Sequence, residues 1–250
     1  MTSPHLQLSG RTAVILGGSG GIGAATAHLL AGAGARVGVV SSRDVDKAAA
    51  VVAALPGEGH RAYAAAVDHT ASLIRLASDV EADLGGAHIL VNSAGVTRPV
   101  PHADLDGLTD ELFDQLMAVN CRGAFAAVRA FAPQLRLDNG LLVNISSIAA
   151  TTGIGSNIAY CASKAGMDIM GVSLARALAP DIRVLTVSPG VVDTDFVPGR
   201  DKAWNDKQVA TTPLKRLTSP DDVAKAVLAC ATTLAFSTGT VIQVDGGRHL

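Results

Sequence analysis

Short apolar runs alternate along the chain with longer segments in which apolar residues recur every three or four positions. The short runs are apolar on both faces, which is typical of strands buried in a parallel sheet. We expect these strands at residues 12–18, 35–42, 61–68, 88–95, 140–147, 182–190 and 239–247. We expect helices at residues 24–33, 44–55, 71–86, 109–135, 159–180 and 219–231. This alternation predicts an α/β fold with a parallel sheet covered by helices on both faces.

The pattern is interrupted between residues 193 and 216. This polar segment contains the single tryptophan of the chain, Trp204, and shows no clear period. A long irregular stretch inside a compact domain is more often functional than accidental, so we expect residues 193–216 to form a lid. Because no linker or repeat divides the rest of the chain, residues 1–250 are predicted to form a single domain.

Composition restricts the classes of function. Of the 250 residues, 48% are hydrophobic and 17% are charged, and the formal net charge is −2. The chain lacks the basic excess that binds nucleic acid, an apolar run long enough for a membrane span and a secretory signal pattern. The three cysteines, Cys121, Cys161 and Cys230, have neither disulfide nor metal-ligand spacing. We therefore predict a cytoplasmic protein with no metal site and with neither nucleic-acid nor membrane partners.

A glycine-rich stretch, LGGSGGIGAATAHLL at residues 16–30, joins the first predicted strand to the first helix. Gly17, Gly21 and Gly23 have the spacing G-x-x-x-G-x-G. One interpretation is a simple glycine-rich turn. The other is a phosphate site, in which Gly17 permits a tight turn, Gly21 lets a pyrophosphate approach and Gly23 lets the helix pack on the strand. Its place between strand and helix favours dinucleotide binding.

The end of the second predicted strand should contact the adenosine ribose of a bound dinucleotide. Enzymes that use NAD usually place an acid there, whereas a 2′-phosphate needs cationic donors. The sequence VVSSRD has Ser41 and Ser42 at the acid's place, followed by Arg43. This favours NADP(H) over NAD(H). The alternative is a solvated arginine that Asp44 partly neutralises.

A second motif lies near the start of the long helix at 159–180. Tyr160 and Lys164 are four residues apart and therefore share one helix face. A neighbouring ammonium group lowers the pKa of a phenol and makes tyrosine a usable acid or base. Ser147, at the end of a predicted strand, could donate to the same carbonyl oxygen. A lone Y-x-x-x-K is usually a surface pair, but the serine and the glycine turn favour a catalytic site.

With these motifs the sequence resembles the classical short-chain dehydrogenase/reductase family from about Ser9 to Gly247. The resemblance implies a single Rossmann-like, doubly wound parallel sheet with helices on both faces. It also implies catalytic roles. Tyr160 would protonate the carbonyl oxygen during reduction, and Ser147 would steady the oxyanion. Lys164 would hold the nicotinamide ribose and lower the tyrosine pKa, and Asn120 would hold a water in a proton relay to the lysine.

The resemblance extends to the cofactor site. Asp68 matches the acid that meets adenine, Asn92 to Gly95 match a fourth-strand motif, and Pro189 to Thr194 match the segment beside the nicotinamide. The predicted cofactor-binding residues are Gly17, Ser19, Gly21, Ile22, Gly23, Ser42, Arg43, Asp68, Asn92, Ala94, Gly95, Tyr160, Lys164, Pro189, Gly190, Val192 and Thr194. The segment 239–247 resembles a strand with which members build oligomers, so we expect a homo-oligomer, a tetramer or a dimer.

Some positions depart from the family pattern. Leu16 replaces the family's threonine, and Ser93 and Ser188 each replace an asparagine. The threonine and the asparagine at position 93 usually support the cofactor loop by polar contacts. Reductases of this family that act on carrier proteins have basic residues beside the active-site mouth, where this chain has Asp138 and Asp181. We expect these acids to disfavour an acidic carrier, although Arg136 and Arg183 could soften the effect.

The sequence therefore predicts an NAD(P)-dependent oxidoreductase that interconverts a ketone and a secondary alcohol of a small-molecule substrate by hydride transfer. An NADPH-dependent carbonyl reductase is favoured. The first alternative is an NAD-dependent alcohol dehydrogenase of the same family. The second is a non-catalytic, dinucleotide-sensing regulator, but such proteins typically lose the tyrosine or the lysine. Phe196, Val197 and Trp204 in the lid, among Arg200, Lys202 and Lys207, fit an apolar ketone with a polar or anionic end.

Overall fold

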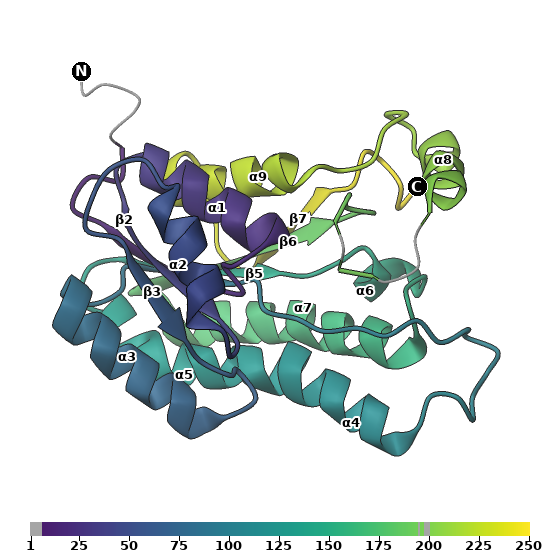
Figure 1. The fold of residues 1–250 in the computed structure, drawn as a ribbon, viewed down its shortest axis with the longest axis horizontal. Coiled ribbons are helices and arrows are strands. Elements are labelled where there is room, and N and C mark those ends of the chain that lie inside the picture. The colour runs from purple at the N-terminus through teal and green to yellow at the C-terminus, as the bar shows by residue number, and fades with distance from the viewer. Residues whose placement is uncertain (1–6, 195, 198–200) are drawn as a thin grey trace.

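A parallel sheet forms the centre of the structure, a computed structural model that describes residues 7–194, 196–197 and 201–250 (Figure 1). Its seven strands lie in the order β3-β2-β1-β4-β5-β6-β7. They are β1 (Thr12–Leu16), β2 (Arg36–Ser41), β3 (Arg61–Ala64), β4 (Ile89–Asn92), β5 (Gly140–Ile145), β6 (Ile182–Pro189) and β7 (Thr240–Val244). All neighbouring strands are parallel. The order reverses between β1 and β4, and such a switch point is where open α/β sheets bind ligands.

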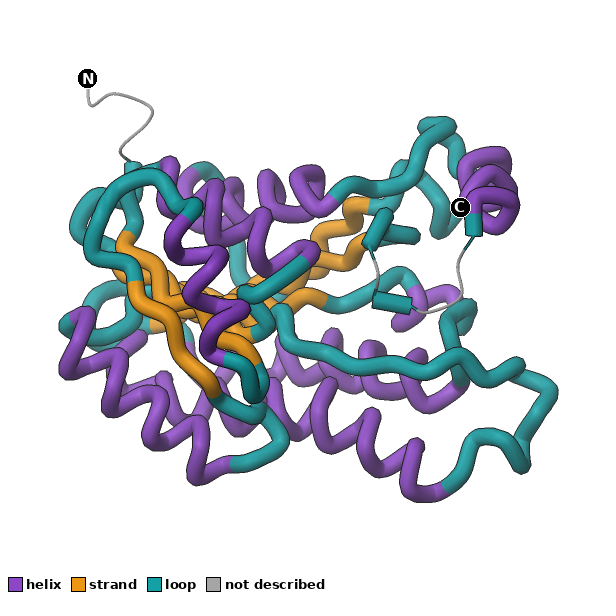
Figure 2. The backbone as a smooth tube through the Cα atoms, in the orientation of Figure 1, coloured by secondary structure: helices purple, strands orange, loops and turns teal. Residues whose placement is uncertain are grey.

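Helices cover both faces of the sheet, which confirms the predicted doubly wound fold (Figures 1 and 2). One layer contains α1 (Gly21–Gly32), α2 (Val45–Ala53) and α9 (Pro220–Thr232). The opposite layer contains α3 (Thr70–Leu84), α4 (Asp110–Met117), the π-helical turn η2 (Ala118–Gly123), α5 (Ala124–Leu135) and α7 (Ile158–Leu178). All seven strands lie in one sheet; that residues 1–250 form a single catalytic domain stays a prediction.

The two helix layers enclose two separate hydrophobic cores. Successive residues of β1 point to opposite faces of the sheet, so Val14 and Leu16 pack in the core beneath α3, α5 and α7. Ala13 and Ile15 pack in the other core with α1 and α9. This strand is buried at every position, which is why it is apolar except at Thr12, whose hydroxyl donates to the Leu84 carbonyl at 3.4 Å. The sheet is therefore packed between the two cores, one on each of its faces.

The structure differs from the predicted elements in the irregular regions. The segment 193–216 contains a helix, α8 (Lys202–Thr211), whose N-cap is Asp201. The helix predicted at 109–135 is divided by η2, and a short helix, α6 (Ala149–Thr152), follows β5. Helix α1 begins at Gly21 rather than Ala24. Glycines make poor helix interiors, but the first turn tolerates them because its N–H groups have no helical partners.

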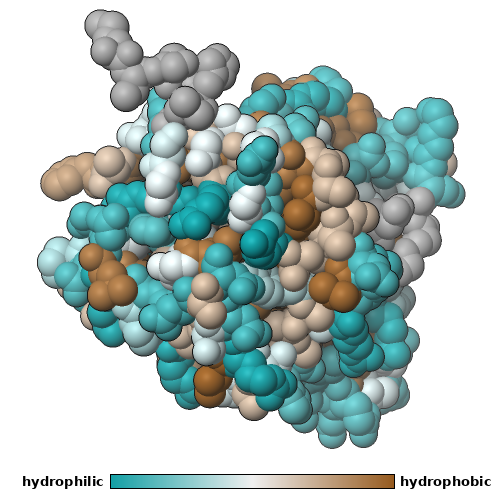
Figure 3. All heavy atoms as spheres, turned by 60° about the vertical axis from the view of Figure 1, so that its left-hand side comes forward, coloured by the Kyte–Doolittle hydropathy of each residue, from teal (hydrophilic) through white to brown (hydrophobic). Residues whose placement is uncertain are grey.

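Apolar and hydrophilic residues are mixed on the face of the molecule that Figure 3 shows. In the face drawn in Figure 3, apolar residues form separate patches among hydrophilic ones. Among the residues that the structure describes, no helix is both long enough and apolar enough to cross a bilayer. The C-terminus lies beside α8 (Figure 1), so the end of the chain returns to the segment 193–216.

Candidate active site

A large cavity opens at the carboxyl ends of the strands. Its volume is about 1350 Å³, above the roughly 300–1,000 Å³ of a typical ligand pocket. Most of the predicted site residues line it: Gly17, Ser19, Gly21, Ile22, Ser42, Arg43, Asp68, Ala94, Gly95, Ser147, Tyr160, Lys164, Pro189, Gly190, Val192 and Thr194. The fold thus brings together residues that the chain separates by more than a hundred positions.

Three predicted residues lie behind the cavity wall instead. A Cβ atom at Gly23 would stand 2.1 Å from the Gly17 carbonyl oxygen, so only glycine lets α1 begin this close to the turn. Asn92 is buried, and its amide nitrogen donates to Asn144 Oδ1 at 2.9 Å and to the Ala124 carbonyl at 3.4 Å. Asn120 is fully buried beneath Val96. These residues support the site and do not face its interior.

The glycine turn has the shape that a pyrophosphate group requires. Gly17 has φ +73°, and a Cβ atom there would stand 2.8 Å from the Ala94 backbone. Helix α1 begins at Gly21, so the unpaired N–H groups of its first turn lie at the cavity wall. A Cβ atom at Gly20 would meet nothing within 4 Å. Bare backbone, a helix N-terminus and open space above it fit the phosphates of a dinucleotide.

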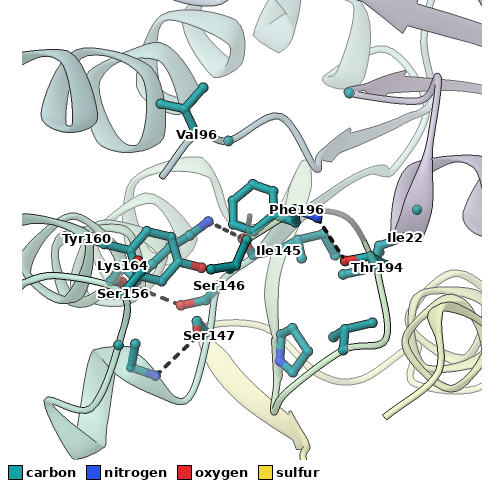
Figure 4. Close-up of a pocket in the computed structure, with 18 of the residues that line it drawn as sticks. Ile22, Val96, Ile145, Ser146, Ser147, Ser156, Tyr160, Lys164, Thr194 and Phe196 are labelled. Carbon is teal, nitrogen blue, oxygen red and sulfur yellow. Dashed lines mark hydrogen bonds between the residues drawn. The ribbon is translucent and has the colours of Figure 1, made fainter. Parts of the chain in front are cut away.

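The polar catalytic candidates converge from two elements, the end of β5 and the start of α7 (Figure 4). Asn157 caps α7: its side chain accepts from Tyr160 N at 2.7 Å and donates to the Arg98 carbonyl at 2.7 Å. This fixes the backbone at Tyr160. The Lys164 ammonium stands 5.8 Å from the centre of the Tyr160 ring. The Ser147 hydroxyl accepts from Ala149 N at 3.2 Å, which places it at the start of α6.

Lys164 is a buried ammonium group. It is 4% exposed, and its Nζ donates to the Ile145 carbonyl at 2.8 Å. Burial lowers its pKa to about 8, because the charged form loses its hydration. Asp168 and Cys121 act in the opposite direction. A lysine in this state can hold or release a proton near neutral pH.

The π-helical turn η2 presents Asn120 to the loop after β4. The Asn120 side chain accepts from Val96 N at 2.9 Å and donates to the Val96 carbonyl at 3.0 Å and to Ser163 Oγ at 3.1 Å. Three of the four hydrogen-bonding positions of this amide are therefore used. A Cβ atom at Gly95 would stand 3.4 Å from Asn120 Oδ1 and 3.8 Å from Lys164 Nζ. Asn120 thus ties α7, η2 and the loop after β4 together directly beside Lys164.

The end of β2 presents an exposed cation to the cavity. Ser42 and Arg43 are both exposed and line it. The Asp44 carboxylate accepts from the backbone N–H groups of Asp46 and Lys47 at 3.1 and 3.4 Å, as the N-cap of α2. The ion pairs of the described residues do not include Arg43. Arg43 and Asp44 thus form no ion pair among the described residues, and the alternative of a solvated arginine stays open.

The segment 193–216 borders the cavity through its apolar residues. Phe196, Val197 and Trp204 line the cavity, and the Phe196 ring lies 6.2 Å from the Tyr160 ring between centres. Lys202 instead pairs with Asp206 at 2.8 Å on the outside of α8. Arg200 lies outside the described residues. That this segment works as a lid stays a prediction.

The sequence analysis missed a basic residue of the cavity, Arg248. Its guanidinium donates to the Gln208 carbonyl at 3.0 Å and to Thr211 Oγ1 at 2.7 Å. It therefore fastens the C-terminal segment to the end of α8 and lines the cavity there. Arg248 stands outside every recognisable motif, and only the return of the chain past β7 places it at the site.

The expectation that Asp138 and Asp181 lie beside the active-site mouth was wrong. Asp138 precedes β5 and Asp181 precedes β6, at the amino ends of these strands, and the Asp181 carbonyl accepts from Gly140 N at 2.9 Å. Ser147 follows the carboxyl end of β5, about 20 Å away along a strand of this length. Asp138 instead pairs with Arg11 at 2.8 Å. Asp138 and Asp181 therefore give no reason to exclude a carrier-protein substrate.

The three residues that depart from the family pattern are each buried or joined by a backbone hydrogen bond. Leu16 is buried in the core as the last residue of β1. Ser93 N donates to the Leu16 carbonyl at 3.0 Å, so the two loops remain joined. Ser188 is buried within β6. None of the three replacements removes a group from the catalytic set.

Comparisons with known proteins agree with this geometry. Residues 17–249 match the model of a family described as enoyl-(acyl carrier protein) reductase. A granaticin polyketide synthase putative ketoacyl reductase 2 of Streptomyces violaceoruber is 38% identical, over 95% of this chain and 96% of that protein. A D-threitol dehydrogenase of Mycolicibacterium smegmatis is 37% identical, over 96% of this chain and 94% of that protein.

A solved structure supports the same relationship. The short-chain dehydrogenase/reductase SDR:glucose/ribitol dehydrogenase of Brucella melitensis superposes with a TM-score of 0.91 at 31% identity. The match covers 98% of this chain and 99% of that structure. Both the fold and the chain length therefore agree with these relatives from end to end.

Proposed function

We propose that this chain, which belongs to the classical short-chain dehydrogenase/reductase family, is an NADPH-dependent carbonyl reductase. Membership of the family makes it an NAD(P)-dependent oxidoreductase acting on a CH–OH group or its ketone. The observation that carries the proposal is the convergence of Ser147, Tyr160 and Lys164 on the cavity that contains the glycine turn. Preference for NADPH and for reduction, a cytoplasmic location and a homo-oligomeric state are the parts that we propose.

The proposed mechanism follows from the positions of the side chains. When bound, the nicotinamide cofactor supplies the hydride. Tyr160 donates the proton that the carbonyl oxygen takes up, and Ser147 donates a hydrogen bond to that oxygen as negative charge develops. Lys164 stabilises the phenolate that remains on Tyr160 and would hold the ribose hydroxyls. Asn120 keeps Val96 and α7 in register beside Lys164.

The substrate end of the cavity favours a bulky apolar ketone. Val100, Ile148, Ile154, Phe196 and Trp204 line it. Apolar lining with few polar groups is typical of sites that bind apolar ligands. Both a simple ketone and a 3-ketoacyl thioester meet this description, and the ketoacyl reductase among the relatives makes the thioester worth testing.

A second candidate is an NAD-dependent polyol dehydrogenase. The similarity to D-threitol dehydrogenase, which covers nearly the whole chain, favours it. A panel of apolar ketones, a 3-ketoacyl thioester of a short thiol and four-carbon to six-carbon polyols separates the two. We expect turnover of the first two groups with NADPH, and loss of that turnover by at least a thousandfold in Tyr160→Phe. Turnover of polyols alone, with NAD, would favour the second candidate.

The cofactor preference is tested by binding titrations that follow nicotinamide fluorescence. We expect NADPH to bind at least tenfold more tightly than NADH, because the exposed Arg43 guanidinium is available to a 2′-phosphate. Arg43→Ala should remove most of that difference and leave NADH binding unchanged. Arg75→Ala, which removes an exposed arginine from α3, is the matched control. Tighter binding of NADH by the wild type would contradict the NADPH preference.

A further inference from the structure

An acidic side chain lies one helical turn after Lys164 on α7. Asp168 is four residues along the helix, so the two side chains project from the same face. Gly171, three residues further on, marks where this face points: a Cβ atom there would stand 3.0 Å from Thr186 Oγ1 on β6 and 3.6 Å from Asn144 Nδ2 on β5. Asp168 therefore faces the sheet between Lys164 and Gly171.

One of the two oxygen atoms of the Asp168 carboxylate lacks a hydrogen-bond donor among the described residues. Its Oδ1 atom is buried and has no hydrogen-bond partner among the described residues. The Ser146 hydroxyl interacts with the carboxylate and also lies 3.5 Å from the Lys164 carbonyl oxygen (Figure 4). An unpaired buried carboxylate oxygen is costly to stability. The Lys164 ammonium group, one helical turn away, stabilises the ionised carboxylate electrostatically.

The charged groups around Lys164 are few. Its ammonium group donates a hydrogen bond to a neutral acceptor, the Ile145 carbonyl. Among the described residues, Asp168 and Cys121 are the acidic groups that act on it, and Tyr160 shares its helix face. Burial raises the pKa of the Cys121 thiol, so this group is neutral at physiological pH. Burial also raises the pKa of the Asp168 carboxyl, while the Ser146 hydroxyl and the Lys164 ammonium group act in the opposite direction. In its ionised form, Asp168 is the source of negative charge near Lys164 among the described residues.

We propose that Asp168 is a positioning residue that keeps the buried Lys164 side chain in the ammonium form that the reaction uses. The inference rests on the proposed function for the role of Lys164, but the charge coupling itself can be measured without cofactor or substrate. No bond is formed or broken at Asp168. It acts through Lys164 by electrostatic attraction along one face of α7.

The sign of the effect follows from the charges. Burial lowers the pKa of Lys164, and the Asp168 carboxylate raises it again. Removing that carboxylate lets the ammonium group lose its proton at a lower pH. The phenol of Tyr160 would respond in the same direction, since loss of a nearby negative charge makes it easier to ionise. The alkaline limb of the reduction profile must therefore move to lower pH in Asp168→Asn.

The first experiment measures Lys164 directly in the cofactor-free protein. The ε-methylene groups of ¹³C-labelled lysine are titrated by NMR, and the Lys164 signal is assigned by its loss in Lys164→Arg. We expect a midpoint near 8 in the wild type and about one pH unit lower in Asp168→Asn. Asp168→Glu keeps the charge and should stay near the wild-type midpoint. Asp79→Asn, an exposed acid on α3, is the control for loss of one negative charge.

The second experiment measures the pH dependence of kcat/KM for carbonyl reduction. We expect Asp168→Asn to match the wild type within about threefold at pH 6, where Lys164 is protonated in both. Near pH 8 its activity should fall about fivefold further, because with midpoints near 8 and near 7 about half of the wild-type lysine but only about a tenth of the variant's lysine is protonated. A loss that is uniform across pH, with the alkaline limb unmoved, would mean a packing role and would overturn the proposal.

A further variant guards against misfolding of Asp168→Asn. Asp168→Leu removes the charge without burying an amide that needs partners, and it should shift the midpoint as Asp168→Asn does. An unchanged Lys164 midpoint in both variants overturns the proposal. A shifted midpoint in a protein that reduces no ketone would instead overturn the proposed function while the coupling stands. The two failures are therefore distinguishable.

Discussion

Single residues at this site are held by contacts that cross between elements. Asn120 bonds to the Val96 backbone and to Ser163, and Asn157 bonds to the backbones of Tyr160 and Arg98. Buried amides that use several of their hydrogen-bonding groups fix geometry because each lost bond leaves an unsatisfied partner. These hydrogen bonds therefore hold the backbone around the candidate catalytic groups in place. Lys164 differs from its neighbours because burial lowers its pKa.

The burial of Lys164 predicts a stability effect that depends on pH. Between pH 8 and 10.5 the unfolded chain binds a proton on this lysine that the folded protein has released. Stability therefore rises with pH across that window. Relative to Lys164→Met, we expect the wild type's free energy of unfolding to increase by about 3 kcal/mol from pH 8 to 10.5. Urea denaturation of the cofactor-free protein at both pH values measures it.

Lys225→Met is the matched control for this measurement, because it removes an exposed lysine from α9. Its stability curve should run parallel to that of the wild type. If the Lys164→Met curve did the same, the lysine would not be deprotonated in the folded protein within this window.

At the scale of elements, the strands were easier to predict than the segments that shape the cavity. Both faces of β1, β4 and β5 are buried, so their sequences show the full apolar signal. The turn η2 could not be predicted from the spacing of apolar residues, because its sequence continues the apolar pattern of α4 into α5. Gln208 is the only residue of α8 that is buried, so this helix has no apolar stripe. In the sequence, the residue that indicates α8 is its N-cap, Asp201.

The cap of α8 gives a prediction at this scale. Asp201 accepts from Trp204 N at 2.7 Å, and an N-cap aspartate typically stabilises its helix by about 1 kcal/mol. In Asp201→Ala we expect amide hydrogen exchange in residues 202–211 to become about fivefold faster. Because Trp204 lines the cavity, KM for the ketone should rise while the melting temperature changes little. Hydrogen exchange by mass spectrometry and steady-state kinetics measure both.

Asp206→Ala serves as the control on the same helix. It breaks the exposed pair with Lys202, which contributes only about 0.3–0.5 kcal/mol. Equal exchange rates in the two variants would show that the cap does not hold α8.

At the scale of the whole molecule, the helix layer of α4, α5 and α7 leaves large apolar side chains on its outer surface. Phe113, Phe125 and Ile169 are 38%, 43% and 65% exposed. Large exposed apolar side chains on one helix layer are typical of an interaction surface. The homo-oligomer stays a prediction, and we expect it to form through this layer.

We expect sedimentation equilibrium to give a dimer or tetramer at micromolar concentration. The double variant Phe125→Glu, Ile169→Glu should sediment as a smaller species, because each buried charge would disfavour the contact. Ile74→Glu on α3, where the isoleucine is 59% exposed, should not change the molecular mass. A monomeric wild type would rule out the predicted assembly.

The sequence by itself determined the fold class and indicated candidates for the catalytic set, which stay predictions. Local signals were enough for this: apolar runs for strands, a glycine spacing for the turn after β1, and the interval from Tyr160 to Lys164. Each depends on residues that are close in the chain, where geometry is fixed by helix or strand period. The cofactor-binding roles and the lid follow from the same signals and stay predictions.

Only the tertiary structure decided which residues meet across the chain. It placed Asp138 and Asp181 at the far end of the sheet, brought Arg248 to the cavity, and set Asp168 beneath Lys164 against Ser146. Burial, which sets the charge state of Lys164, is likewise a property of the packed layers. Distances between residues far apart in sequence, and the solvent that each loses, are fixed by the packing of both helix layers on the sheet, which no local pattern encodes.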